Sequence, residues 1–413
     1  MRKIPAILAA TTFAFAAQGA LAQSKYDALF DALWSKVDQN FYDPHFHGVD
    51  WKAAGAHYRE KLAGVESDAQ FEALASAVLA ELHASHTHIT PPSDSPASSV
   101  GIGVRVHTIV GQDVVTQIAP LSDAWRAGLR PGDALLSAPV SLRGEAGSPA
   151  QVDVAHCDGT HSSYSIRRAG AFWPPEEPGF RWSSIELNEK TRIGFIVIDR
   201  FDDGAAALAD RAMADLKDTQ GLIVHIRANT GGNASALRLA SYFGKESPAF
   251  VLLSRPYLVA LGHPVTQADV MAAPKVEGAY TDAAVFQAVG DKGGGAAFWS
   301  EDVGAKRYGG PVVVLTGEDT GSAAEGFAWF MRLKTSAHII GRRTQGAFLG
   351  GESFDLPGGW SLTLPVYGLW GPDGGDYGDK PVTPDRTIAL ARNDICQGRD
   401  REIEAAMDYL TAR

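Results

Sequence analysis

The sequence predicts an α/β core preceded by a helical N-terminal domain and an inserted β-rich domain. Three observations lead to this fold class: apolar residues recur at three- and four-residue spacing before residue 83, short β-type runs follow residue 100, and apolar strands alternate with helices after residue 193. Such alternation is typical of a sheet that is buried on both faces. We therefore expect domains at residues 23–95, 96–171 and 172–413.

The chain has the composition of an ordinary globular protein with an acidic excess. Its 413 residues are 45% hydrophobic and 21% charged, which is sufficient for several packed cores. The 48 acidic residues exceed the 37 basic ones, so the formal net charge is −11. A nucleic-acid backbone or an anionic membrane surface would be repelled overall, and we expect neither as a partner.

The N-terminus has the pattern of a secretory signal peptide. Arg2 and Lys3 precede an apolar run at residues 4–17, and Ala20-Leu21-Ala22 supplies the small residues that a signal peptidase requires. We expect residues 1–22 to be removed on export to the periplasm or the exterior. A stable membrane anchor is not expected, because the run is shorter than the roughly 20 residues that span a bilayer.

The chain has two cysteines, Cys157 and Cys396. In an oxidising compartment they could pair or remain separate, and their spacing favours neither outcome. Two cysteines without a Cys-x-x-Cys pair make a structural zinc site improbable, and we expect no metal site.

The helical domain is predicted from two amphipathic stretches. Apolar residues repeat with helical spacing over residues 26–37 and 71–82, and turn-forming segments around Pro44 and Gly48 separate them. The second helix is expected to end at His83. A loop rich in Pro and Ser should then lead into the next domain.

The β-rich domain is predicted from short apolar runs at residues 101–106, 113–118 and 134–136, with a short helix that Gly128 ends. Its segments Gly101-Ile102-Gly103-Val104 and Ala127-Gly128-Leu129-Arg130-Pro131-Gly132-Asp133 resemble a PDZ domain. The resemblance implies that an extended peptide adds a strand and that backbone N–H groups of the loop at Gly101, Ile102, Gly103 and Val104 receive its terminal carboxylate. A PDZ-like fold that only spaces or regulates the core is the alternative.

The α/β core is predicted from strands that alternate with helices. Strands are expected at residues 193–198, 221–226, 311–315 and 337–340, with helices at residues 205–216, 234–243 and 323–333. A hairpin over residues 353–365 should turn at Pro357-Gly358-Gly359. Residues 244–310 are Gly-rich and are expected to be irregular.

Two strand-to-helix turns of the core carry patterns suited to acyl-transfer chemistry. Gly231 and Gly232 follow one strand and expose backbone N–H groups at a helix N-terminus, where a phosphate or a developing oxyanion can bind. Ser322 lies between small residues at the other turn, in the position of a nucleophile, with the N–H of Ala323 beside it. A plain connecting loop and an N-cap serine are the alternatives.

Taken in order, these segments resemble the S41 family of serine peptidases, the C-terminal processing and tricorn-core group. The motifs that carry the resemblance are Arg227-Ala228-Asn229-Thr230-Gly231-Gly232, Gly321-Ser322-Ala323-Ala324-Glu325, Leu82-His83-Ala84-Ser85-His86-Thr87 and Pro381-Val382-Thr383-Pro384-Asp385. The resemblance implies an α/β catalytic core of ClpP/crotonase-like βαβ units. It also implies Ser322 as nucleophile, with N–H groups of Ala323 and of Gly231 or Gly232 as the oxyanion hole.

The resemblance assigns the general base to a histidine. Ala347 occupies the position where the processing-peptidase branch has a lysine, so a Ser-Lys dyad is absent. Ser85-His86 is similar to the pair in the tricorn-like branch, and a neutral imidazole suits proton abstraction near pH 7. The alternatives for His83, His86 and His88 are metal ligation or a structural role.

The third catalytic member is open, because Gly378 stands where the tricorn-like branch has a glutamate. Asp379 or Asp376 could replace it, or both could be solvated turn residues. Glu325 is expected to have a capping or helix-dipole role. Arg342-Arg343 is interpreted as a solvated pair, with a substrate carboxylate as its alternative partner.

These expectations describe an exported serine peptidase that hydrolyses polypeptide or peptide substrates without a metal or organic cofactor. His86 would deprotonate Ser322, which attacks the peptide carbonyl. A catalytically decayed S41 scaffold that binds peptides or another ligand is the alternative, because Ala347 and Gly378 replace two residues of the family pattern.

Overall fold

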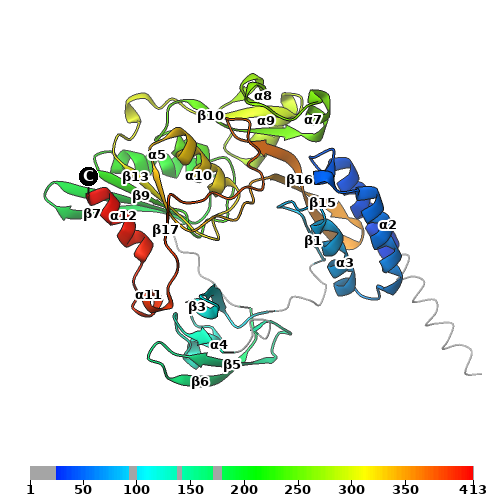
Figure 1. Cartoon of the computed structure of the whole chain (residues 1–413), viewed down its shortest axis with the longest axis horizontal. Coiled ribbons are helices and arrows are strands. Elements are labelled where there is room, and N and C mark those ends of the chain that lie inside the picture. The colour runs from blue at the N-terminus through cyan, green and yellow to red at the C-terminus, as the bar shows by residue number, and fades with distance from the viewer. Residues whose placement is uncertain (1–24, 93–99, 137–141, 171–178, 413) are drawn as a thin grey trace, which may run out of the picture.

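The computed structural model describes residues 25–92, 100–136, 142–170 and 179–412. Figure 1 shows three parts: N-terminal helices in blue, a small β-rich unit in cyan, and a larger α/β body that extends to the C-terminus. The expected signal peptide at residues 1–22 lies outside the described residues. Within the described ranges, no helix is long and apolar enough to cross a membrane.

The N-terminal part is helical, as the apolar spacing predicts. Residues 25–40 form the first helix, followed by α2 (Trp51–Lys61) and α3 (Asp68–Ala80). Side-chain oxygens cap the last two: Asp50 accepts from the Ala53 N–H, and Ser67 from the Gln70 N–H. The helix α3 ends at Ala80, a few residues before the expected boundary.

The β-rich unit is one antiparallel sheet with strand order β2-β3-β4-β5-β6. Its elements are β2 (Val104–Ile109), β3 (Gln112–Ile118), α4 (Asp123–Ala127), β4 (Ala134–Leu135), β5 (Pro149–Ala155) and β6 (His161–Arg167). Ser122 caps α4, and Gly128 ends it with a φ of 112°. The expected helix and the strands expected at residues 113–118 and 134–136 are therefore confirmed, whereas the strand expected at residues 101–106 is shifted to Val104–Ile109. This strand, β2, lies at one edge of the sheet.

The body contains the predicted parallel sheet, with strand order β17-β14-β13-β9-β8-β7. Its strands are β7 (Phe180–Asn188), β8 (Thr191–Ile198), β9 (Gly221–His225), β13 (Val312–Thr316), β14 (His338–Gly341) and β17 (Arg386–Thr387). All neighbours pair in parallel except β7 and β8. The associated helices are α5 (Ala205–Leu216), α6 (Ala236–Ala240), α10 (Ala323–Lys334), α11 (Arg392–Cys396) and α12 (Arg401–Thr411).

A second sheet, which the sequence analysis did not predict, joins the N-terminal helices to the body. It contains β1 (His88–Thr90), β10 (Ser247–Ser254), β11 (Lys275–Val276), β12 (Gly295–Ser300), β15 (Gly350–Leu356) and β16 (Trp360–Trp370). The expected hairpin is β15 and β16, and β1 pairs antiparallel with β16. This pairing places the loop before β1 next to the body.

The expectation that residues 244–310 are irregular is wrong. They contain three strands of the second sheet and the helices α7 (Arg255–Leu261), α8 (Gln267–Ala272) and α9 (Asp282–Asp291). The strand β10 is buried along most of its length and lacks the polar alternation of a half-exposed strand. The Gly-rich segment on which the expectation of irregular structure rested is only the turn between α9 and β12. Gly293 and Gly294 have positive φ in this turn.

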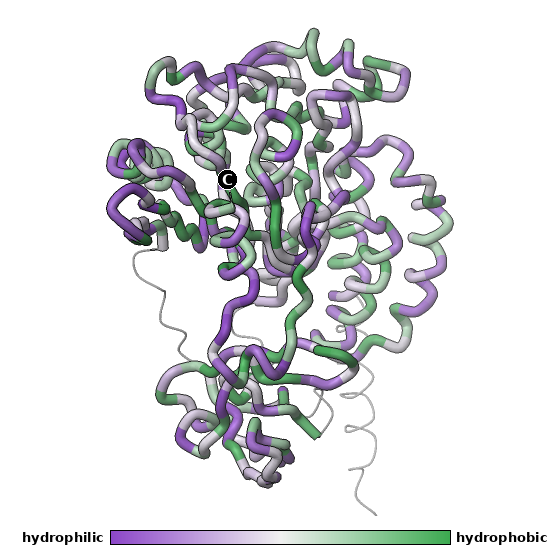
Figure 2. The backbone as a smooth tube through the Cα atoms, turned by 60° about the vertical axis from the view of Figure 1, so that its left-hand side comes forward, coloured by the Kyte–Doolittle hydropathy of each residue, from purple (hydrophilic) through white to green (hydrophobic). Residues whose placement is uncertain are grey.

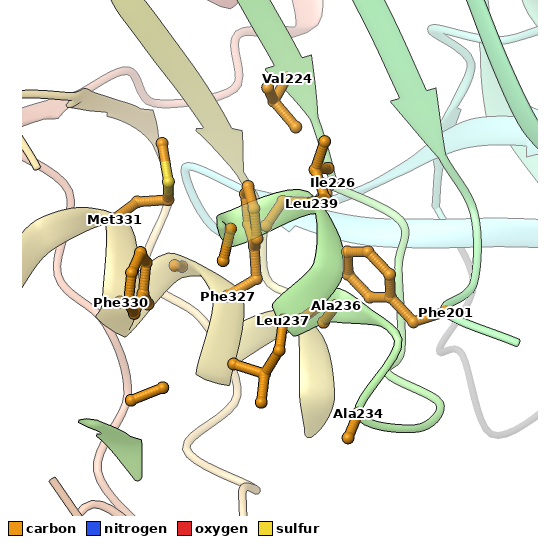
Figure 3. Packing of buried hydrophobic residues seen from close by; sticks show 14 of the residues in the cluster. Phe201, Val224, Ile226, Ala234, Ala236, Leu237, Leu239, Phe327, Phe330 and Met331 are labelled. Carbon is orange, nitrogen blue, oxygen red and sulfur yellow. The ribbon is translucent and has the colours of Figure 1, made fainter. Parts of the chain in front are cut away.

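The interior is built from aromatic and aliphatic side chains of the strands and of α6 and α10. Figure 3 shows Phe201, Leu237 and Phe327 gathered in the cluster below the ends of β8 and β9. Phe201 and Phe327 lie with ring centroids 5.9 Å apart. Figure 2 shows that hydrophobic and hydrophilic stretches alternate along the backbone in every part of the molecule. Burial of the clustered side chains holds the ends of β8, β9 and β13 in fixed positions.

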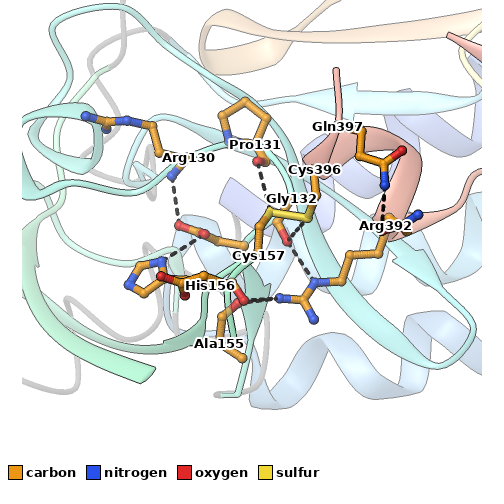
Figure 4. Close-up of a disulfide and its surroundings, with 12 residues drawn as sticks. Arg130, Pro131, Gly132, Ala155, His156, Cys157, Arg392, Cys396 and Gln397 are labelled. Atoms are coloured by element: carbon orange, nitrogen blue, oxygen red, sulfur yellow. Dashed lines mark hydrogen bonds and ion pairs between the residues drawn. A yellow bond between two sulfur atoms is a disulfide. The ribbon is translucent and has the colours of Figure 1, made fainter. Parts of the chain in front are cut away.

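A disulfide ties the β-rich unit to the C-terminal segment. Cys157 and Cys396 form this bond, which answers the question that their spacing left open. Arg392 reinforces it by donating to the carbonyl oxygens of Gly132 (2.8 Å), Ala155 (2.7 Å) and His156 (2.9 Å), as Figure 4 shows. The short helix α11 is thus fixed to the β-rich unit by covalent and charge-assisted contacts.

Replacement of both Cys157 and Cys396 by Ser is expected to lower the free energy of unfolding by about 2–4 kcal/mol, since the cross-link restricts the unfolded chain. Thermal unfolding followed by circular dichroism measures the change, with and without a thiol reductant. The reductant should destabilise the wild type and leave the double variant unaffected. Equal transition midpoints for the oxidised wild type and the double variant would contradict the prediction.

Candidate active site

One cavity of ≈360 Å³ contains four of the catalytic and oxyanion residues that were predicted from the sequence. His86, Gly232, Ser322 and Ala323 all line it. They come from three separate segments: the loop before β1, the turn after β9, and the junction of β13 with α10. The fold therefore brings the predicted histidine and serine to the same cavity.

Ser322 has a strained backbone conformation at the start of α10. Its φ of 50° and ψ of −125° lie outside the regions that non-glycine residues usually adopt, and such a conformation costs about 1–3 kcal/mol. Hydrogen bonds fix the preceding loop: Thr320 Oγ1 donates to the Ile226 carbonyl (2.8 Å), and the Gly321 N–H donates to the Asn229 carbonyl (3.0 Å). The loop that ends at Ser322 is therefore tied to the turn after β9.

The N–H group of Gly231 is already used inside the protein. It donates a 2.8 Å hydrogen bond to Oδ1 of Asn229, a fully buried side chain. A Cβ atom at Gly231 would lie 2.5 Å from Cβ of Ser322, so only glycine fits beside the serine. Of the two glycines expected as oxyanion donors, the structure therefore disfavours Gly231, which provides space instead.

The N–H group of Gly232 lies on the side of the turn that faces away from Phe201. Phe201 bonds to the two neighbours of Gly232: the Phe201 N–H donates to the Gly231 carbonyl (2.9 Å), and the Phe201 carbonyl accepts from the Asn233 N–H (2.8 Å). In such a parallel bridge the N–H of the intervening residue points to the opposite side. In the described chain, no protein acceptor pairs with the N–H of Gly232 or of Ala323. These two groups are the candidate oxyanion donors.

A buried carboxylate holds the start of α10 against the loop after β14. Glu325 is fully buried and accepts from the N–H groups of Ser322 (3.2 Å), Gly346 (2.7 Å) and Ala347 (2.6 Å). Burial raises the pKa of Glu325, and these hydrogen bonds act in the opposite direction. Its role is wider than the expected capping of α10, because it also fixes the loop that contains Gly346 and Ala347.

His86 lies on a tight loop with a φ of 57°. Its Nδ1 lies 3.3 Å from Oγ of Ser85, and no protein partner engages Nε2 in the described ranges. Burial lowers the pKa of His86 below its ordinary value of 6.5, and the charge of Asp379 acts in the opposite direction. The imidazole is therefore mainly unprotonated at neutral pH and can accept a proton.

Asp379 contacts the Ser85-His86 loop, whereas Asp376 does not. Oδ1 of Asp379 accepts from the Ser85 N–H at 2.9 Å. Asp376 accepts from the N–H of Gly378 at 3.0 Å. A Cβ atom at Gly378 would lie 2.2 Å from Cδ2 of Leu349, so this position has no room for a glutamate without a rearrangement. Asp379 is consequently the acid that approaches His86.

A tyrosine and a histidine that the sequence analysis did not select support this loop from the N-terminal part. Nδ1 of His47 lies 2.9 Å from the Leu82 carbonyl, so Nδ1 carries the ring proton. Nε2 of His47 then accepts from the Tyr42 hydroxyl at 2.7 Å. Burial raises the pKa of Tyr42, which keeps the hydroxyl protonated. No sequence motif marks this pair as a support for the histidine loop.

Two acids of the C-terminal segment hold the loops behind the cavity. Arg227 pairs with Asp400 and Glu402, and Arg342 pairs with Glu402 through a 2.5 Å contact. Glu402 is 3% exposed, and the Arg342 side chain is 15% exposed. The interpretation of Arg342 as part of a solvated pair is therefore wrong, because its partner is the buried Glu402. Glu402 lies on α12, far from Arg342 along the chain, so the sequence does not indicate this pair.

The remaining predicted residues lie away from the cavity. Gly101, Ile102, Gly103 and Val104 belong to the β-rich unit and do not line it. His83 and His88 are exposed, and the described residues hold no group of three or more His, Cys, Asp or Glu side chains arranged for a metal.

Part of the wall of the cavity is apolar. The side chains that form it come from α6, α9, the second sheet and the loop before β15: Leu237, Phe250, Phe286, Phe348, Leu349 and Leu369. The cavity therefore combines polar groups with apolar side chains.

Two family models match the chain. The model of peptidase family S41 matches residues 192–388, and the model of the Tricorn protease C1 domain matches residues 23–80. The first range contains the turn after β9, Ser322 and Asp379. The second covers most of the N-terminal helices and ends shortly before His86.

Curated relatives include two processing proteases. The carboxy-terminal processing protease CtpB of Bacillus subtilis is 24% identical over 318 residues, which cover 73% of this chain and 58% of the relative. The chloroplastic C-terminal processing peptidase of Tetradesmus obliquus is 24% identical over 414 residues, which cover 90% of this chain and 79% of the relative. The chain thus spans little more than half of the bacterial relative.

Solved structures share the fold. The photosystem II D1 C-terminal processing protease matches with a TM-score of 0.54 and 20% identity, covering 90% of this chain and 96% of that one. Mature CPAF in complex with lactacystin matches with a TM-score of 0.66 and 16% identity, covering 95% and 98%. The family models show that the chain carries a peptidase family S41 domain at residues 192–388, preceded by a Tricorn C1 domain at residues 23–80.

Proposed function

We propose that the protein is a serine peptidase that cleaves peptide bonds through Ser322 and His86. The observation that carries this proposal is the placement of both side chains on one cavity, together with the unpaired N–H groups of Gly232 and Ala323. A nucleophile, a base and two oxyanion donors are the groups that acyl transfer requires. The match of residues 192–388 to peptidase family S41 supports the same reaction.

In the proposed reaction, Nε2 of His86 takes the hydroxyl proton of Ser322 as Oγ attacks the substrate carbonyl carbon. The carbonyl oxygen becomes an oxyanion and accepts hydrogen bonds from the Gly232 and Ala323 N–H groups. His86 then gives its proton to the leaving amine, and an acyl ester remains on Ser322. Water attacks this ester with His86 again as base, which releases the acid product and restores the serine.

Ser85 and Asp379 act in this proposal as positioning residues. The Ser85 hydroxyl lies beside Nδ1 of His86, and Asp379 holds the Ser85 backbone. The negative charge of Asp379 favours the protonated imidazole that forms during the attack. This pair would take the place of the glutamate that has no room at position 378.

The apolar side chains that line the cavity support a substrate with an apolar side chain beside the cleaved bond. Phe250 and Phe348 pack with ring centroids 5.4 Å apart, and Phe250 stacks on Phe298 at 5.2 Å. Burial of a Leu or Phe side chain against such rings stabilises the bound peptide by about 1.5–3 kcal/mol before the costs of binding. We therefore propose peptides with Leu, Met or Phe at this position as substrates.

The β-rich unit and the N-terminus complete the proposal. We assign the unit as PDZ-like, with its edge strand β2 and the preceding Gly101–Val104 loop as the receptor of a peptide C-terminus. We also propose that the protein is exported after removal of residues 1–22. The Cys157–Cys396 disulfide supports this location, because such bonds persist in oxidising compartments.

A fluorophosphonate probe tests the nucleophile directly. The folded protein without residues 1–22 should be labelled, peptide mapping should locate the adduct on Ser322, and the Ser322→Ala variant should not react. Quenched peptides with a central Leu should be cleaved by the same preparation. Peptide binding without labelling or cleavage would overturn the proposal and favour the decayed scaffold, to which the replacements at Ala347 and Gly378 point.

A further inference from the structure

Arg200 is held beside the turn that carries the oxyanion donor. It follows β8 and directly precedes Phe201, whose N–H and carbonyl bond to Gly231 and Asn233. Two backbone hydrogen bonds therefore fix the position of Arg200 relative to Gly232. Its side chain lines the same cavity as Ser322 and His86.

The guanidinium group of Arg200 has no partner in the described chain. Other arginines around the body are engaged: Arg227 with Asp400 and Glu402, and Arg238 with Asp210 and Glu301. No hydrogen bond or ion pair within the described ranges engages Arg200, and Arg200 is exposed to solvent. It is thus a solvated cation in the lining of a cavity that also contains apolar side chains.

The charges of Arg200 and Asp203 both act on Asp282. Asp282, at the start of α9, also lines the cavity, and burial together with the charge of Asp203 raises its pKa, while Arg200 lowers it. Asp203 accepts a 2.6 Å hydrogen bond from Nδ2 of Asn233, so it is already occupied. Neither acid forms an ion pair with the guanidinium, whose donors remain open to a carboxylate from outside.

We propose that Arg200 binds a carboxylate group of the peptide substrate inside the catalytic cavity. This inference rests on the proposed peptidase function. It adds a negatively charged group to the apolar side chain that the proposed substrate carries. The carboxylate has two possible sources: the C-terminus of the peptide, a few residues from the cleaved bond, or an acidic side chain near that bond. Both present the planar pair of oxygens that a guanidinium fork recognises.

Two pairs of quenched peptides with a central Leu distinguish these sources. The first pair has the same neutral sequence and ends in a free acid or an amide. The second pair is amidated and has Glu or Gln next to the central Leu. At low ionic strength, either the free-acid peptide or the Glu peptide should have a kcat/KM roughly tenfold above that of the neutral peptide of its pair. A roughly tenfold difference is the effect of one charge-assisted hydrogen bond. Salt should reduce the preference, because the site is exposed.

The Arg200→Met variant should lose this preference, so that the ratio of the two kcat/KM values approaches one. Arg200→Lys should keep part of it, since a charge remains without the fork. Arg211→Met is the matched control: Arg211 is an exposed arginine of α5 that packs over the Trp182 ring, and its removal should leave the ratio unchanged. Asp282→Asn should raise the ratio, because it removes a competing carboxylate.

The outcomes separate this inference from the proposed function. Preference for the free acid assigns the terminal carboxylate, and preference for Glu assigns a side chain. If the wild type cleaves all four peptides equally, or if Arg200→Met keeps the preference, the assignment of Arg200 is wrong and the peptidase function stands. If the wild type cleaves none of them and the fluorophosphonate probe fails to label Ser322, the proposed function itself fails.

Discussion

The His86→Ala variant is expected to lower kcat/KM by roughly a thousandfold to ten-thousandfold, the range that a general base contributes to serine acyl transfer. The physical reason is that Ser322 keeps its place beside the oxyanion donors but loses the group that removes its proton. The rate of acylation is measured with an activated ester or by stopped-flow fluorophosphonate labelling. It should decrease by a similar factor as the rate of peptide cleavage. A peptide with a central Leu supplies the steady-state measurement.

His83→Ala is the matched control for this variant. Like His86, His83 has a positive φ, of 49°, so both replacements place alanine in the same unfavourable backbone region. His83 is exposed and does not line the cavity, so its loss should leave kcat/KM within a few-fold of the wild type. Equal losses in both variants would show that the loop, rather than the imidazole, determines activity.

The pH dependence of kcat/KM gives a second measurement of the same role. Activity requires the unprotonated imidazole, and burial lowers the pKa of His86 below 6.5. The acidic limb of the profile should therefore have its midpoint below pH 6.5, with full activity above it. A midpoint above 6.5 would mean that another group titrates, and the assignment of His86 as base would be wrong.

Much of the body could be predicted from the sequence because the relevant signals are local. Helical spacing gave α5 at residues 205–216 with its observed bounds, and the apolar runs gave β8, β9, β13 and β14 within two residues. The small residues around Ser322 indicated a turn into a helix, and the structure has α10 at that place. Periodicity and turn chemistry depend on neighbouring residues, so one sequence is enough to detect them.

The contacts that complete the site could not be predicted, because they depend on backbone direction and on distant segments. Gly231 and Gly232 are adjacent residues of the same type, so the sequence does not distinguish their roles. Only the hydrogen bonds that Asn229 and Phe201 form with this turn determine which N–H group remains unpaired. Glu402 lies far from Arg227 and Arg342 along the chain, and no motif links them. The disulfide likewise depended on where the fold places two distant cysteines.

Gly232→Ala is expected to lower kcat/KM by roughly a hundredfold to a thousandfold, the loss that removal of one oxyanion donor causes. A Cβ atom at this position would lie 1.8 Å from the Phe201 carbonyl oxygen, so the backbone has to move. The φ of 133° is also unfavourable for any residue with a side chain. The movement turns the N–H away from the point where the oxyanion forms, and kcat should decrease more than KM changes.

The control for Gly232→Ala is Gly262→Ala, because Gly262 ends α7 with a φ of 70° and has no atom within 4 Å of the added Cβ. Both variants place alanine in the left-handed region, which costs about 1 kcal/mol of stability, but only one changes the turn beside Ser322. Kinetics normalised to the folded fraction from circular dichroism separate the two effects. If Gly232→Ala is folded and hydrolyses peptides as fast as Gly262→Ala, the oxyanion is stabilised by another donor, and the free N–H of Gly232 has no catalytic role.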